Sequence, residues 1–173
     1  GYTYDMSCFV AWGDKLASEG PAAFYSADYF ADYPPGYILV LGLVSLVRKA
    51  LQLSYESHWT YFLLALIPAI CDCAAVVLLD HISRRYMGQG RAQRCLVLFA
   101  AFCPLTLFDT GIWKQIDGAF ALPLLLCFWL LEERRYLLAA GLYGVALAIK
   151  PQALLAGPVL AVCFLVAIAD AVR

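Results

Sequence analysis

Apolar segments of almost bilayer-spanning length constrain the fold of this chain more than any other feature. They run from Trp59 to Leu79, Cys95 to Ile112, Ala119 to Leu131, Leu137 to Ile149 and Ala153 to Ile168. A transmembrane helix needs ~20 apolar residues to cross the ~30 Å hydrocarbon core, so the middle segments depend on flanking aromatic and charged residues to extend them. The pattern predicts an all-α polytopic transmembrane helix bundle of about five crossings over residues 59–173.

Composition agrees with a membrane environment and excludes one class of partner. The chain is 64% apolar and 14% charged, whereas a soluble domain is nearer half apolar and a quarter charged. Its net charge is −1 and it has no basic block, so we expect no nucleic-acid partner. Most of the cysteines lie in apolar segments, where thiols pack as small hydrophobes, and no histidine accompanies Cys71 and Cys73. We therefore expect no structural metal site.

Arginine placement predicts the orientation of the bundle. Two crossings separate each group of arginines from the next, so all of them share one side, which the positive-inside rule makes cytoplasmic. These arginines are Arg84, Arg85, Arg91, Arg94, Arg134, Arg135 and Arg173. The turns "GIWKQIDG" and "KPQ" then face the extracytoplasmic side.

The double proline in "FADYPPGYIL" marks a corner in the N-terminal region. Pro34 and Pro35 fix φ near −65° and remove two backbone donors, so the chain is not helical through Tyr33, although a helix can begin directly afterwards. We expect this rigid corner to lie at the membrane surface, with Tyr33 and Tyr37 at headgroup depth.

The apolar stretch from Tyr37 to Val47 decides where the N-terminal region lies. At 1.5 Å per residue it reaches ~16 Å, about half of the hydrocarbon core, which suits a re-entrant or interfacial helix. Residues 1–58 are therefore predicted to form an extracytoplasmic loop with juxtamembrane helices. A full crossing would place Arg48 and Lys49 opposite Arg84, which is a tidier charge distribution, so charge alone leaves that alternative open.

Polar residues from three separated stretches then share one water-facing surface. A chain this apolar does not need so many hydrogen-bonding groups at one interface merely to end its helices, so their clustering indicates a site. They are Asp5 and Asp32 with Tyr33, the run Trp113, Lys114, Gln115 and Asp117, and Lys150 with Gln152.

Four motifs in series resemble a known enzyme superfamily. They are "YDMSCFVAWGDKLASEGPAAFY", "DYPPGYILVLG", "IWKQIDGAF" and "IKPQA". Together they are similar to the polytopic glycosyltransferases of the GT-C superfamily, nearest to bacterial members related to the oligosaccharide-assembly glucosyltransferases and the protein O-mannosyltransferases. The resemblance implies an acid and membrane-surface helices in the first extracytoplasmic loop, beside a bundle that receives a polyprenyl-phosphate sugar. It also implies further helices before Gly1 and after Arg173, which fits a sequence that starts without methionine or a readable signal peptide.

The resemblance makes Asp5 the candidate general base. The acceptor hydroxyl must lose a proton as it attacks the anomeric carbon, and a positioned carboxylate can accept that proton. A single displacement from the opposite face would invert the anomeric carbon. The leaving phosphate needs positive charge, for which Lys150 and Lys114 are the available cations.

The remaining candidates are predicted to bind substrate. Gln115 and Asp117 suit sugar hydroxyls, and Asp117 has the alternative role of holding a divalent cation. Trp113 has the alternative role of an interfacial anchor, and Asp32 that of capping the turn before Pro34. No cofactor is expected beyond the lipid-phosphate sugar, and the acceptor is a glycan, a lipid or a protein.

Two other kinds of protein remain open at this stage. A lipid or sugar transporter or flippase would also place polar residues near helix breaks, although transporters usually hold their substrate near the midplane and often carry repeated halves. A membrane scaffold would leave the polar cluster without a purpose. Asp72 lies within the first apolar segment, where an acid is costly unless it is paired. It is predicted to join helices, or alternatively to line a substrate path.

Overall fold

The computed structural model describes residues 2–26 and 28–172, and for residues 2, 3 and 170–172 it describes the backbone alone. All regular structure in these ranges is helical, which confirms the predicted fold class. Gly1 and Arg173, on which the expectations about the chain ends depend, lie outside the described residues. Three helices are long and apolar enough to cross a membrane, namely His58–Met87, Arg91–Trp113 and Pro151–Ala169.

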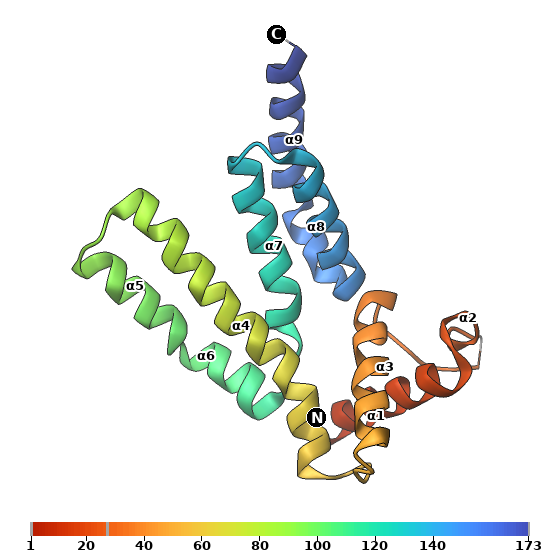
Figure 1. Cartoon of the computed structure of the whole chain (residues 1–173). Helices are drawn as coiled ribbons and strands as arrows, with labels where there is room; N and C mark the ends of the chain where they lie inside the picture. Colours follow the sequence, from red (N-terminus) through yellow and green to blue (C-terminus); the bar gives the residue numbers. More distant parts are fainter. Residues whose placement is uncertain (1, 27, 173) are drawn as a thin grey trace.

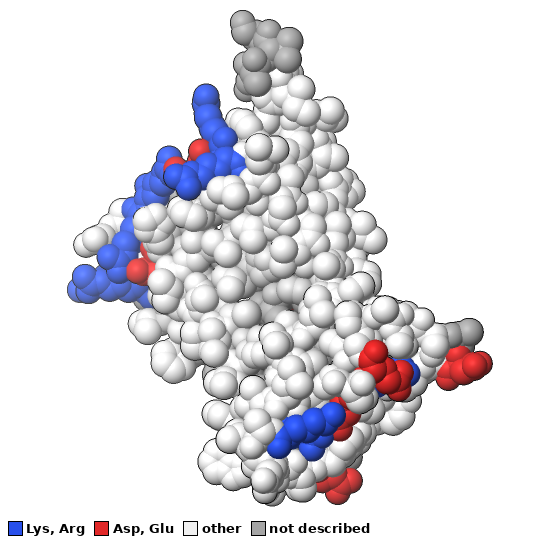
Figure 2. Space-filling view, turned by 45° about the vertical axis from the view of Figure 1, so that its right-hand side comes forward, with Lys and Arg blue, Asp and Glu red and all other residues white. Residues whose placement is uncertain are grey.

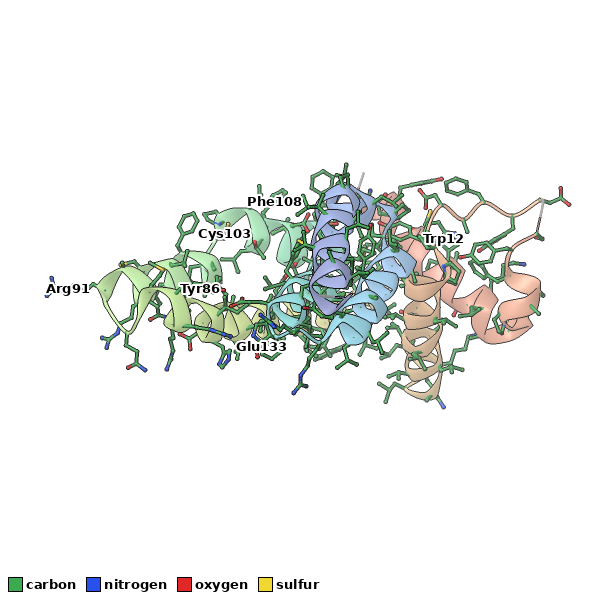
Figure 3. The ribbon with its side chains drawn as sticks, turned by 90° about the horizontal axis from the view of Figure 1, so that it is seen from above. Trp12, Tyr86, Arg91, Cys103, Phe108 and Glu133 are labelled. Carbon is green, nitrogen blue, oxygen red and sulfur yellow. The ribbon has the colours of Figure 1, made fainter. Side chains whose placement is uncertain are left out.

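The helices follow one another with short connections, as Figure 1 shows. In chain order they are α1 (Tyr2–Glu19), α2 (Pro21–Phe24), α3 (Pro35–Ala50), α4 (His58–Met87), α5 (Arg91–Ala101), α6 (Pro104–Leu107), the π-helical turn η1 (Phe108–Trp113), α7 (Asp117–Glu132), α8 (Tyr136–Ile149), the 3₁₀ turn η2 (Pro151–Ala156) and α9 (Gly157–Val172). Seen from above, they form three groups in a row (Figure 3). The pair of α4 and α5 lies at one end, α7 to α9 lie in the middle, and α1 to α3 lie at the other end.

Prolines end or begin several of these helices where the sequence predicts it. Pro34 is the N-cap of α3, which starts directly after the corner, and α8 ends at Ile149 because Pro151 cannot continue it. A break absent from the sequence-based prediction interrupts the expected Cys95–Ile112 helix at Pro104. Helices occupy all the predicted crossings, but α7 has 16 residues and α8 has 14, so the number of crossings stays a prediction.

The N-terminal group packs around aromatic side chains. The apolar face of α1, including Phe9 and Trp12, covers Tyr37 and Leu41 of α3 in one buried cluster. Gly13 allows the close approach, because a Cβ there would lie 2.5 Å from the Leu41 carbonyl oxygen. The side chain of Tyr37 is 1% exposed beneath α1, so it does not contact lipid headgroups as an anchor would, and its depth in the membrane stays a prediction.

Arg48 is also buried, between α1 and α3. Its guanidinium lies 2.7 Å from both carboxylate oxygens of Asp14 in α1, and it donates to the Leu53 carbonyl at 2.9 Å. Arg48 is therefore neutralised by Asp14, and whether the stretch from Tyr37 to Val47 crosses the membrane stays a prediction.

The middle group covers only one half of α4. Gly118, in the first turn of α7, packs against Pro68 and Asp72 near the middle of α4. At the other end of α7, Glu133 pairs with Arg85. The first half of α4 therefore extends beyond α7, and it packs against the N-terminal cluster instead.

Charged side chains gather at opposite ends of the visible face (Figure 2). Lys and Arg gather at the end where α4 finishes, and a second group of acids and bases lies over the N-terminal helices, with a broad uncharged band between them. The arginine-rich α4–α5 turn meets the α7–α8 turn because Arg85 contacts both Glu132 and Glu133. These two predicted cytoplasmic turns do lie together.

Candidate functional site

Polar side chains from distant segments meet where α7 begins and α8 ends. Gln115 donates through Nε2 to Asp5 Oδ2 at 3.2 Å, although 110 positions separate the two residues. Next to Gln115, after one buried residue, Asp117 pairs with Lys150 at the end of α8. The predicted carboxylate and the predicted lysine corner thus belong to two side-chain pairs held by one short stretch of chain, residues 115–117, and these two pairs are named the network here.

The turn between η1 and α7 directs these side chains. Lys114 adopts a left-handed conformation with φ of 58°, which reverses the chain after η1. The Gln115 backbone N–H then donates to the Asp109 carbonyl at 3.0 Å, and the side chain of Ile116 is fully buried in the N-terminal cluster. With Ile116 buried between them, Gln115 reaches Asp5 and Asp117 reaches Lys150.

Tyr33 lies beside the network, at the corner before α3, and lines the same pocket as Lys150. Its ring packs 5.6 Å from the rings of Phe9 and Trp12, and Tyr25 donates its hydroxyl to the Tyr33 carbonyl at 2.8 Å. Burial, followed by the charges of nearby acids, raises the pKa of Tyr33 to about 12. The phenol is therefore neutral at physiological pH and acts as a hydrogen-bonding group.

Acids surround Tyr33 more densely than the sequence indicates. After burial, the contributions to its raised pKa come from the negative charges of Asp32, Asp117, Asp5 and Asp109. These four carboxylates come from four separate segments, and each raises the pKa of Tyr33 through its charge. Among the described residues, no group of three histidine, cysteine or acidic side chains has the arrangement of a metal site.

A pocket of about 450 Å³ opens beside this network. The predicted binding residues Asp32, Tyr33, Lys150 and Gln152 line it, together with Pro151 and two leucines of η2. Lys150 is held between Asp117 and the face of Phe120, whose ring centroid lies 5.7 Å from Nζ. The pocket therefore combines one cation, one acid, one amide and a phenol with the apolar side chains of Pro151 and two leucines.

Trp113 and Lys114 lie away from that pocket, so the predicted binding residues divide into two groups. Lys114 lines a second pocket of about 400 Å³, formed between η1 and the first half of α4, where the lining is mostly apolar. Trp113 packs edge to face against Phe108, with the ring centroids 6.1 Å apart. The sequence placed both residues with Gln115, and the reversal at Lys114 separates them.

Two residues near the network were missing from the sequence-based prediction. Asp109 lies within the apolar run "LFDTGIW", and Thr110 follows it with a side chain that donates to Asp72. An acid within an apolar helix is a signal that could have identified Asp109, as it did identify Asp72. Pairing of Lys150 with Asp117 was not foreseen either, because it needs the packing of α7 on α8.

Comparison with known families decides the kind of protein that carries this network. Residues 30–169 match the model described as glycosyltransferase family 87. The chain belongs to this glycosyltransferase family. The match covers both pockets and the whole network except Asp5, which precedes the matched residues. No curated protein and no solved structure matches the chain.

For a family 87 glycosyltransferase, the network offers the groups that sugar transfer requires. Asp5 is a partly exposed carboxylate, able to accept a proton. Lys150 is a cation whose side chain is 13% exposed, and in a site that is partly dry a positive charge stabilises a developing negative charge strongly. Neutral Tyr33 and the amides of Gln115 and Gln152 are hydrogen-bonding groups of the kind that orient hydroxyls.

Proposed function

We propose that this glycosyltransferase moves a sugar from a polyprenyl-phosphate donor to an acceptor hydroxyl on the extracytoplasmic side of a multi-pass membrane protein. The observation that supports it most is the hydrogen bond from Gln115 to Asp5, because Gln115 lies two positions before Asp117, which pairs with Lys150. The resemblance to the GT-C superfamily supports the donor class. We also propose that the chain is related to the bacterial oligosaccharide-assembly glucosyltransferases and the protein O-mannosyltransferases, on the basis of the same resemblance.

Asp5 acts as the general base in this proposal. Its carboxylate accepts the proton of the acceptor hydroxyl while the oxygen forms a bond to the anomeric carbon and the bond from that carbon to the phosphate oxygen breaks. Attack from the face opposite the phosphate gives a product of inverted configuration. Gln115 holds the carboxylate from one side at 3.2 Å, which leaves its other oxygen for the acceptor.

Lys150 receives the donor phosphate. The phosphate competes with Asp117 for the ammonium group, because the singly charged diester of the donor is a strong partner for a partly desolvated lysine, and the leaving phosphate, which gains a second charge, is a stronger one. Asp117, once released from Lys150, is then available to sugar hydroxyls. Leu154 and Leu155 line the same pocket and supply an apolar surface beside the phosphate for the first part of the lipid chain.

The decisive experiment replaces Asp5 by asparagine in the full-length protein. Transfer from a polyprenyl-phosphate sugar should fall by roughly 100-fold or more, because general-base catalysis of this kind contributes about 10²- to 10⁴-fold. Asp28→Asn is the matched control, since Asp28 is an exposed acid of the same N-terminal region and should keep its activity. Near-normal turnover by purified Asp5→Asn protein would refute the assignment of the base.

The same assay separates this proposal from transport. A flippase or transporter moves the lipid-linked sugar across the bilayer without cleaving it, whereas a transferase releases polyprenyl phosphate. Detection of the released lipid phosphate, with an inverted anomeric carbon in the product, is the expected result. Movement of intact donor with no release would favour the transporter.

A further inference from the structure

We propose that Asp72 is a positioning residue for sugar transfer, which acts by holding both ends of the segment that carries Gln115 and Asp117. The inference rests on the proposed function, because the segment matters through its contacts with Asp5 and Lys150. Asp72 itself touches neither of these two residues through a hydrogen bond, and it is distinct from the groups assigned to substrate.

The first contact fixes the start of the segment. Thr110 donates its hydroxyl to Asp72 Oδ2 at 2.5 Å, and the Thr110 side chain is almost completely buried in η1. A hydrogen bond between a hydroxyl and a carboxylate is among the stronger neutral-to-charged contacts in proteins. Asp72 therefore holds η1 to the middle of α4.

The second contact fixes the end of the segment. Gly118 packs so closely on α4 that a Cβ there would lie 2.8 Å from Asp72 Cγ and 2.9 Å from the Pro68 carbonyl oxygen. Only a residue without a side chain allows α7 to begin at this distance. The same carboxylate thus contacts the chain at Thr110 and again at Gly118.

Between these contacts the chain has little freedom. The Gln115 amide is bonded to the Asp109 carbonyl at 3.0 Å, and Ile116 is fully buried. Gln115 and Asp117, on either side of Ile116, then meet Asp5 and Lys150. Loss of the contact at Thr110 would let the whole turn shift relative to Asp5.

The position of Asp72 argues against simple packing as its purpose. It lies near the middle of α4, a helix long and apolar enough to cross a membrane, where an acid is expensive. An apolar side chain would fill the space without that expense. Unlike an apolar side chain, the Asp72 carboxylate accepts a hydrogen bond from the Thr110 hydroxyl. This hydrogen bond fixes the position of the turn between η1 and α7.

The experiment uses Thr110→Val, which removes the hydroxyl at nearly constant volume, with Thr110→Ser as the conservative control. In the full-length protein, Thr110→Val should lower kcat for transfer by roughly 10- to 100-fold, the scale of a misplacement of about 1 Å. Thr110→Ser should restore most of kcat. Asp72→Asn, which keeps an acceptor oxygen, should be milder than Asp72→Ala.

Hydrogen exchange provides a readout that does not depend on activity. Backbone amides of residues 108–118 should exchange faster in Thr110→Val than in the parent protein, whereas those of α8 and α1 should be unchanged. Unchanged exchange over 108–118 would overturn the positioning role whatever the activity. If Asp5→Asn were fully active while exchange did rise, the proposed base would fail and the structural role of Asp72 would stand.

A double-mutant cycle then links the turn to Asp5. Gln115→Ala and Thr110→Val should together lower kcat by much less than the product of the single effects, because both act by misplacing the same base. Effects that multiply would show independent actions and overturn the proposal. Thr60→Val is a control for the cycle, since Thr60 is a buried threonine of α4 whose hydroxyl bonds to the Ser54 carbonyl instead.

Discussion

Arg48 illustrates how a single buried charge stabilises the N-terminal helices. It lies between α1 and α3, where Asp14 receives hydrogen bonds from both Arg48 and Ser45. Burial raises the pKa of Asp14, but these hydrogen bonds and the positive charges of Arg48 and Lys49 outweigh burial and lower it overall. The pair thus joins two helices that otherwise pack mainly through apolar side chains.

Substitution of Arg48 by methionine should destabilise the protein by about 2 kcal/mol. Removing one partner of a buried pair costs ~3–5 kcal/mol, and we reduce this range because the Asp14 side chain is 28% exposed. Lys49→Met is the matched control: its side chain is 44% exposed and lies 3.7 Å from Asp14, so its loss should cost less than ~1 kcal/mol. Thermal unfolding in detergent measures both, and equal effects would contradict the burial argument.

The same pair predicts an acid dependence of stability. The folded pKa of Asp14 is lowered, so its contribution is present above the unfolded value of ~3.9 and is lost as the pH falls below it. The parent protein should therefore lose more stability between pH 5 and 3 than Arg48→Met does. Unfolding temperatures across this range test the difference, and parallel curves would exclude a role for Asp14.

At the scale of the helices, glycine sets how closely α3 and α8 approach. The first turn of α3 lies directly against the end of α8, because a Cβ on Gly36 would lie 2.6 Å from the Ala148 carbonyl oxygen. This contact places Tyr33, just before α3, beside Lys150, just after α8. The width of the candidate donor pocket therefore depends on one close backbone contact.

Gly36→Ala should force these helices apart at a cost of about 1–3 kcal/mol, the usual range for overpacking. Transfer should also fall, because Tyr33 and Lys150 move away from each other. Gly144→Ala is the control within α8: a Cβ added there would have open space within 4 Å, so the higher helix propensity of alanine should leave stability equal or higher. Loss of stability in Gly144→Ala comparable to that in Gly36→Ala would contradict the explanation.

Local signals in the sequence predict where a helix begins or ends better than they predict which other helices it packs against. Pro34 and Pro151 mark helix boundaries through backbone chemistry that needs no tertiary context. The burial of Tyr37 and Arg48 depends instead on α1, which packs over both residues. The sequence near a proline corner gives no sign of whether an aromatic residue there is covered by another helix. Grouping of Asp5 with Gln115 and Lys150 was predicted, whereas the ion pair of Lys150 with Asp117 required the packed helices.

At the scale of the whole molecule, the charge distribution and the site define two opposite ends. The arginine-rich turns gather at one end (Figure 2), and the Asp5 network lies toward the other, where α7 begins. If the arginine end is cytoplasmic, as the positive-inside rule predicts, the network faces outward. The orientation of the helices in the membrane therefore determines on which side of the membrane an acceptor can reach the network.

Side-specific cysteine labelling tests this topology. In a variant whose seven native cysteines are replaced by alanine, Asp5→Cys, Glu56→Cys and Gln115→Cys should react with an impermeant maleimide from outside. Gln89→Cys, in the exposed α4–α5 turn, should react only after the membrane is opened. Labelling of positions 5 and 115 from opposite sides would contradict the shared site.

Synthesis of the chain gives the bond between Asp5 and Gln115 a further meaning. The N-terminus leaves the ribosome first, and Asp5 then waits until more than a hundred further residues have been made before its partner exists. Until that moment the nascent chain lacks the group that orients the Asp5 carboxylate, so this contact can form only after most of the helices have been made.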